Sequence, residues 1–178
     1  MATNYLDVKI YGGKRMNKDK LDLILEQWAA EKPGLDCAPM AVIGRALRLA
    51  AHLDRELTKV FAGLGLPPGG FDVLATLLRA GPPYQLSPND LLRWMLVTSG
   101  TMTHRLDQLE KAGWVERRPN PADGRGVLVA LTEAGKTLAD KALAAHLDNE
   151  RKLLSGLTAV QQEQLTDLLR IWLRNFEA

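Results

Sequence analysis

The sequence has 178 residues, a net charge of +2, 46% hydrophobic residues and 25% charged residues, which is ordinary for a globular protein. This length fits one domain, or one domain with extensions, and suffices to bury a sizeable core. The single cysteine excludes an internal disulfide and fits a reducing compartment. The N-terminus lacks the apolar run of a secretory signal, and no apolar stretch approaches the roughly 18 residues that span a bilayer. We therefore expect a cytoplasmic protein without membrane contact, in which nucleic-acid binding requires local clustering of positive charge.

The N-terminal part of the chain predicts a tail followed by two helices. Residues 1–16 show no clean periodicity and are expected to form a loose tail. Asn17 can cap a helix that continues to about residue 32. Its apolar side carries Leu21, Ile24, Leu25 and Trp28. After the break at Pro33-Gly34, an apolar stripe predicts a long helix over about 39–64, so residues 17–66 are assigned to N-terminal helices.

Residues 67–131 predict a winged helix-turn-helix domain. A helix over 71–79 is followed by the turn residues Gly81-Pro82-Pro83. Two short helical patterns then follow between Ser87 and Gly113, and a basic two-stranded hairpin follows them. The predicted fold class is therefore mainly α, with six or seven helices and a two-stranded β-wing.

Residues 132–178 predict two C-terminal helices. Thr132 can cap a helix to about residue 154, and Thr158 can cap a last helix. In that last helix the apolar side chains of Trp172 and Phe176 lie one turn apart. Such a helix can close the core of a monomer, but we favour a homodimer interface because helix-turn-helix proteins usually pair to contact two half-sites.

The second helix of the predicted helix-turn-helix has distinct inner and outer faces. Met102, Leu106 and Leu109 follow the i, i+4, i+7 spacing of a buried face. The outer face and its flanks carry Gly100, Thr101, Thr103, His104, Asp107, Gln108 and Lys111. Ser99 and the free N–H groups of the first turn can hold a phosphate. Small hydrogen-bonding residues at a helix start suit approach to base edges, whereas an ordinary solvated helix would not explain the basic hairpin that follows.

The hairpin predicts a wing that contacts DNA. Strands are expected over 114–118 and 127–131, with Pro119 and Pro121 ending the pairing and Asp123-Gly124 forming the turn. Arg125 near the tip can enter a minor groove, and Asp123 can hold its side chain. The alternative is an exposed ion pair of little energetic value. Arg117 and Arg118 add positive charge for phosphates, unless one of them has an internal role.

These motifs resemble the MarR family of winged-helix transcriptional regulators. The resemblance rests on Asp123-Gly124-Arg125, on 127–132 (Val-Leu-Val-Ala-Leu-Thr), and on the helix 99–113. It covers roughly residues 37–176 and implies a homodimer joined by its N- and C-terminal helices. It also implies a repressor that binds a pseudo-palindromic double-stranded operator.

Within that family the chain is similar to the HucR, PecS and TamR subgroup, whose members respond to small anions of the urate, aconitate or citrate type. The segments 70–77 and 97–105 and an additional N-terminal helix carry this likeness. It implies an effector site lined by Trp28, Asp72, Arg105 and Arg117.

Residue patterns alone single out Arg105 from this set. Arg105 lies at the margin of the buried helix face, where its side chain can reach beneath the helix toward Asp72. Each ligand residue also has a structural alternative. Arg105 can form a structural salt bridge or contact a phosphate, and Trp28 can simply pack in the core. Asp72 can be an acidic residue at the start of a helix, where the helix dipole favours it. An anion that pairs with Arg105 and Arg117 would repel Asp72 and shift the helix and the wing.

Other functions have weaker support. A redox sensor would depend on Cys37, but neighbouring Asp36 disfavours its thiolate. A metal sensor would draw on His52, His104 and His146, which lack ligand spacing. No pattern indicates an enzyme or a cofactor. A dimeric DNA-binding regulator without a ligand stays open.

Overall fold

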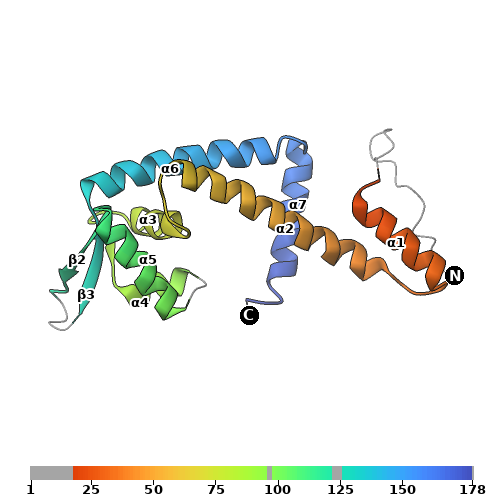
Figure 1. The fold of residues 1–178 in the computed structure, drawn as a ribbon, viewed down its shortest axis with the longest axis horizontal. Helices are drawn as coiled ribbons and strands as arrows, with labels where there is room; N and C mark the ends of the chain where they lie inside the picture. Colours follow the sequence, from red (N-terminus) through yellow and green to blue (C-terminus); the bar gives the residue numbers. More distant parts are fainter. Residues whose placement is uncertain (1–17, 96–97, 122–125, 178) are drawn as a thin grey trace. The chain divides into compact units, whose positions relative to one another are not determined.

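The computed structural model describes residues 18–95, 98–121 and 126–177, which form seven helices and a small sheet (Figure 1). In chain order the elements are α1 Lys20–Glu31, α2 Ala38–Gly63, α3 Gly70–Arg79, β1 Gln85–Leu86, α4 Pro88–Trp94, α5 Ser99–Lys111, β2 Val115–Pro119, β3 Val127–Leu131, α6 Glu133–Leu153 and α7 Ala159–Leu173. The chain divides into two compact units, Met1–Asp54 and Arg55–Ala178, and α2 runs from the first into the second. Along these described ranges, none of the helices is both long and apolar enough to cross a membrane.

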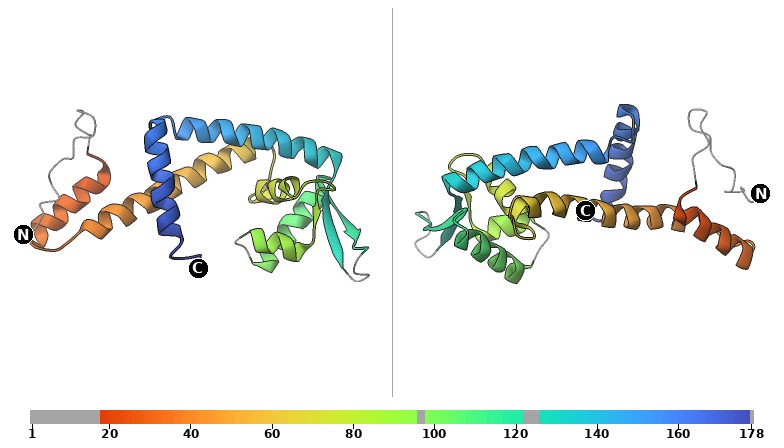
Figure 2. Two further views of the ribbon diagram at one scale, coloured as in Figure 1. Left: turned by 180° about the vertical axis from the view of Figure 1, so that it is seen from behind. Right: turned by 45° about the horizontal axis from the view of Figure 1, so that its top comes forward.

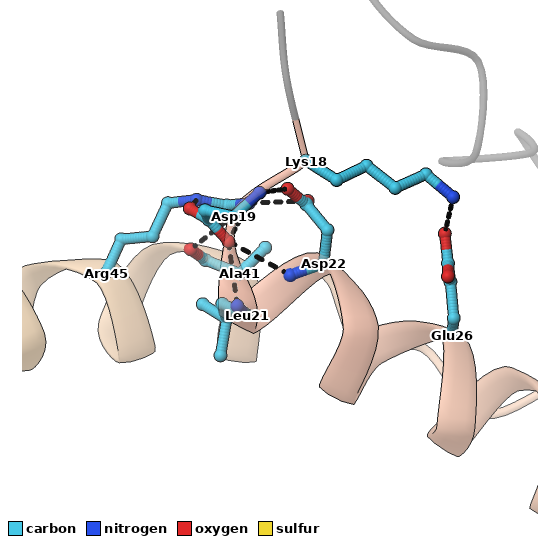
Figure 3. A network of polar contacts seen from close by, with 7 residues as sticks. All are labelled: Lys18, Asp19, Leu21, Asp22, Glu26, Ala41 and Arg45. Atoms are coloured by element: carbon cyan, nitrogen blue, oxygen red, sulfur yellow. Dashed lines mark hydrogen bonds and ion pairs between the residues drawn. The ribbon is translucent and has the colours of Figure 1, made fainter.

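In the first unit, α1 is attached to the N-terminal half of α2 by one buried side chain and one arginine (Figure 3). Leu21 is buried against Gly44, where an added Cβ would lie 2.9 Å from Leu21 Cδ2. Arg45 donates from Nε to Asp19 over 2.8 Å and from Nη2 to Asp22 over 2.5 Å. Glycine therefore permits the close approach of the two helices, and the arginine holds them together.

The start of α1 corrects one expectation. Asn17, which lies outside the described residues, was expected to cap this helix. The structure shows instead that the N-cap is Asp19. Its carboxylate accepts hydrogen bonds from the N–H groups of Leu21 and Asp22, and Asp22 accepts a bond from the Asp19 N–H in return. Both candidates are capping residue types two positions apart, and the reciprocal partner at Asp22 favours the later one.

The core of the second unit lies between α3, α4, α5, the sheet and α6. Its most completely buried large side chains are Val73, Leu74, Leu77, Leu91, Met102, Leu109 and Val129. The expected inner face of α5 is confirmed, because Met102, Leu106 and Leu109 are all buried. This packing fixes which face of α5 points to solvent.

The sheet has three strands rather than the two that were expected. Its order is β1-β3-β2, and both pairings are antiparallel. β1 has only two residues, too few to produce an alternating sequence pattern. Pro119 was expected to stop pairing, but it stands opposite Val127 as the last residue of edge strand β2, where a missing N–H is tolerated.

The caps expected for the last two helices are confirmed. Thr132 accepts a hydrogen bond from the Gly135 N–H, and Thr158 accepts one from the Gln161 N–H. α7 begins near the C-terminal end of α6 and points away from it at a steep angle (Figure 2). It has no buried residue. Several of its large apolar side chains are more than half exposed: Val160, Leu168, Ile171 and Leu173. The apolar face of α7 is therefore uncovered in a single chain.

Candidate nucleic-acid interface and anion site

The first turn of α5 presents its backbone N–H groups at an exposed helix end. Thr98 is the N-cap, and its hydroxyl accepts a hydrogen bond of 3.3 Å from the Thr101 N–H. Thr98 was not identified from the sequence, although threonine is a common helix cap; Ser99 and the free N–H groups of the first turn were expected to hold a phosphate. An uncapped N–H group and the positive end of the helix dipole favour an anion such as a DNA phosphate.

The structure brings the predicted DNA-contacting residues of α5 onto its solvent-exposed surface. The residues in question are Ser99, Gly100, Thr101, Thr103, His104, Gln108 and Lys111. Thr103 donates its hydroxyl proton to the Ser99 carbonyl over 3.1 Å, which leaves its oxygen free to accept. A Cβ added at Gly100 would meet nothing within 4 Å, so the helix start offers open space for a large partner.

The structure describes both strands of the wing, but residues 122–125 at its tip lie outside the described residues. Arg118 of β2 pairs with Glu116 of the same strand, and both side chains are about half exposed. Asp123 and Arg125 lie outside the described residues, so their roles stay predictions from the sequence.

Asp72 and Arg105, two of the predicted ligand residues, do lie together. Arg105 Nη1 is 3.8 Å from Asp72 Oδ2, and the arginine side chain is only 18% exposed, although α5 also carries the exposed residues named above. Its guanidinium lies over Gly69, where an added Cβ would be 2.0 Å from Arg105 Cζ. Gly69 precedes α3 with φ of 70°, a left-handed conformation that glycine adopts without strain. A glycine therefore makes room for a largely buried cation next to a carboxylate.

An aromatic cluster that the sequence did not reveal lies beside this pair. The rings of Phe61 and Phe71 stack at 4.2 Å between centroids, and the His146 ring lies 4.9 Å from that of Phe71. His146 Nε2 is 3.2 Å from Glu150 Oε1, whereas its buried Nδ1 has no hydrogen-bond partner. Partial burial raises the pKa of Asp72, although electrostatic interactions with Arg105 and His146 act in the opposite direction.

Arg117 lies in a different ion-pair network from Arg105. Its guanidinium contacts Asp107 over 2.6 Å and also pairs with Glu110, both of which belong to α5. The hydrogen bond to Asp107 is the main cause that raises the pKa of Arg117, against a smaller opposing effect of burial. The structure thus couples Arg117 to two carboxylates, and not to the Asp72–Arg105 pair.

Trp28 belongs to the first unit and is 39% exposed there. Arg105 belongs to the second unit, so the tryptophan's ligand role stays a prediction from the resemblance. In the part of the chain that the structure describes, no three His, Cys, Asp or Glu side chains gather as a metal site.

Comparison with known proteins points to one family. A sequence model of the MarR family matches residues 64–126. The HTH-type transcriptional regulator PecS of Dickeya dadantii is 41% identical over 146 residues, which cover 82% of this chain and 88% of PecS. The multiple antibiotic resistance protein MarR of Escherichia coli is 35% identical over 130 residues, or 72% of this chain and 88% of that protein.

Solved structures agree with the sequence comparison. A mutant of MarR from E. coli complexed with operator DNA superposes with a TM-score of 0.67 at 31% identity, covering 79% of this chain and 99% of that one. The regulator Sco3205 of Streptomyces coelicolor, also in complex with DNA, gives a TM-score of 0.71 at 26% identity, covering 79% of this chain and 92% of that one.

Proposed function

Because the chain belongs to the MarR family of DNA-binding transcriptional regulators, we propose that α5 and the wing contact a double-stranded operator. The supporting observation is the division of α5 into a buried apolar face and an exposed face of small polar residues. The proposed contacts are Ser99, Gly100, Thr101, Thr103, His104, Gln108, Lys111 and Arg118, with Asp123 and Arg125 added from the sequence. A helix of this kind places its N-terminal residues in the major groove, while an arginine at the wing tip suits the minor groove.

We also propose that the operator-binding species is a homodimer. The uncovered apolar side chains of α7 require a partner surface, and Phe176 just beyond it is 75% exposed. A second copy of the chain offers the same surface, and a two-fold dimer matches two half-sites about one helical turn apart.

The proposed effector is a small organic anion of the urate, aconitate or citrate type that binds at Arg105. A carboxylate or urate edge can accept two parallel hydrogen bonds from the guanidinium, which is stronger than the 3.8 Å contact with Asp72. Because Arg105 lies on α5, a ligand that moves it acts directly on the helix that contacts DNA. Arg117 is not needed for this site, since two carboxylates already pair with its guanidinium.

The size of the required effect is small. A ligand that favours the DNA-free conformation by about 1.4 kcal/mol weakens operator binding tenfold. Displacing Asp72, whose carboxylate is already disfavoured by partial burial, supplies a physical cause for such a difference. We expect the anion-bound protein, which releases DNA, to be the state in which the anion separates Arg105 from Asp72.

The test is fluorescence anisotropy on a duplex that the purified protein selects from a random-sequence library. Urate, trans-aconitate and citrate are titrated separately at fixed pH and salt, because phosphate contacts make affinity depend steeply on salt. One of these anions should release the DNA from the wild-type protein and from Arg151→Gln, an arginine variant of α6. Arg105→Gln should bind the duplex but resist release.

The other outcomes separate the remaining candidates. If the anion releases DNA from Arg105→Gln at the concentration that releases it from the wild-type protein, the proposed anion site at Arg105 is wrong. Indifference of the wild-type protein to all three anions would support a ligand-independent regulator. Sensitivity to peroxide that Cys37→Ser abolishes would support a redox sensor instead.

A further inference from the structure

A salt bridge ties the wing to α5 through one carboxylate. Glu110 accepts a hydrogen bond of 3.1 Å from the backbone N–H of Arg117 and pairs with its guanidinium through the other oxygen. Asp107, one turn earlier on α5, accepts the second arm of the same guanidinium over 2.6 Å. Asp107, Glu110 and Arg117 are called the helix–wing bridge below.

The bridge adds a second point of attachment between α5 and β2. Nearer the base of the wing, the Trp114 N–H donates to the Leu109 carbonyl over 3.0 Å. Arg117 lies three residues further along the chain and stands opposite the fully buried Val129 of β3. Two attachments at separate positions restrict rotation of a strand about either one alone, so the bridge helps to fix the angle between wing and helix.

The charges of the bridge are unusual for a surface that meets DNA. Asp107 and Glu110 place two carboxylates on the helix that carries the proposed DNA contacts, where unpaired negative charge would repel phosphates. Pairing with Arg117 neutralises much of that charge. The Arg117 side chain is 31% exposed, and two carboxylates already pair with it, so less of its charge is available for a phosphate.

We propose that Glu110 is a positioning residue for operator binding, which acts by fixing the wing against α5 through Arg117 and Asp107. This inference rests on the proposed DNA contacts of α5 and the wing. Specific binding requires both elements to reach their grooves at one relative angle, whereas binding to arbitrary DNA depends mainly on total charge. Loss of the bridge therefore lowers the preference for the operator more than the affinity for random DNA.

The direction in which one substitution changes DNA affinity distinguishes a positioning role from a purely electrostatic one. Glu110→Ala removes a negative charge near the DNA and also removes the bridge, and the bridge predicts weaker binding to the selected duplex, by about fivefold or more. Simple electrostatics predicts tighter binding. Glu116→Ala is the matched control, because it removes the same charge from β2, where Glu116 pairs within its strand with Arg118. It should bind at least as tightly as the wild-type protein.

A second variant keeps the test decisive if Glu110→Ala folds poorly. Arg117→Lys retains the positive charge but replaces the forked guanidinium by a single ammonium, which cannot span both carboxylates in the same geometry. The bridge predicts that this variant also loses operator preference, with an unchanged slope of log affinity against log salt. Circular dichroism melts identify any variant that is unfolded at the assay temperature.

Several results would overturn the inference. If Glu110→Ala binds the selected duplex as tightly as Glu116→Ala, the positioning role is wrong. The same conclusion follows if Arg117→Lys keeps the wild-type operator preference. A salt slope reduced by about 0.9 in Arg117→Ala would identify Arg117 as a phosphate contact instead. If the wild-type protein itself selects no duplex, the proposed DNA contacts fail first, and the inference falls with them.

Discussion

Gly69→Ala should disable the Asp72–Arg105 pair while leaving the fold intact. The new Cβ would lie 2.0 Å from Arg105 Cζ and 2.3 Å from its Nε, so the guanidinium must leave its position. The atoms in conflict belong to the end of a flexible side chain, so the backbone of α5 need not move.

The expected loss of stability is modest and can be built from two contributions. Alanine at φ of 70° costs about 1–2 kcal/mol. Loss of the partly exposed ion pair adds up to about 1 kcal/mol. The sum of roughly 1–3 kcal/mol corresponds to a decrease in Tm of several degrees for a chain of this size.

Gly65→Ala is the control for backbone strain. Gly65 has φ of 78°, and a Cβ there would meet nothing within 4 Å. Both variants should melt a few degrees below the wild-type protein, as measured by circular dichroism. In the anisotropy assay, Gly65→Ala should still release DNA with the anion, whereas Gly69→Ala should need at least tenfold more anion, a loss of about 1.4 kcal/mol or more. Equal anion sensitivity of the two variants would refute the role given to Arg105.

Three further predictions test other parts of the structure. Arg45→Met should release α1 from α2, because the arginine pairs with Asp19. Proteolysis within α1 should become faster while the Tm of the remaining chain is unchanged, and an unchanged cleavage rate would contradict this prediction. Gly135→Ala should lower Tm strongly, since its Cβ would lie 1.8 Å from the Trp114 carbonyl oxygen, and a shift under about 2 °C would argue against this close packing. Asp72 has a raised pKa, so its contribution to stability is present below its ordinary pKa and is lost as pH rises through the folded value. The Tm of Asp72→Asn minus that of the wild-type protein should therefore increase from about pH 4 to about pH 7, and a constant difference would exclude the raised pKa.

Local patterns in the sequence predicted the parts of the fold that depend on local physics. The 3.6-residue period placed Met102, Leu106 and Leu109 in the core and Arg105 at its margin, because a helix of known pitch allows no other arrangement. The caps Thr132 and Thr158 followed from the same kind of reasoning, since a cap bonds to N–H groups within three residues of itself.

Features that join distant segments could not be predicted in this way. The sequence around Arg117 does not indicate whether its side chain contacts a phosphate, a ligand or Glu110. Its actual partner depends on how a strand packs against a helix. The approach of Gly69 to Arg105 and the contact between the tilted rings of His146 and Phe71 likewise need the tertiary fold. The two-residue strand β1 forms only because β3 offers an edge for it.

The most direct test of the account is a hydroxyl-radical footprint of the protein on its selected duplex, with and without the releasing anion. A dimer that places one α5 helix in each of two major grooves predicts two protected patches on one face of the duplex, about 10 base pairs apart, with flanking protection from the wings. The anion should remove all of this protection together. A single isolated patch, or protection that persists at saturating anion, would contradict a dimeric regulator released through Arg105.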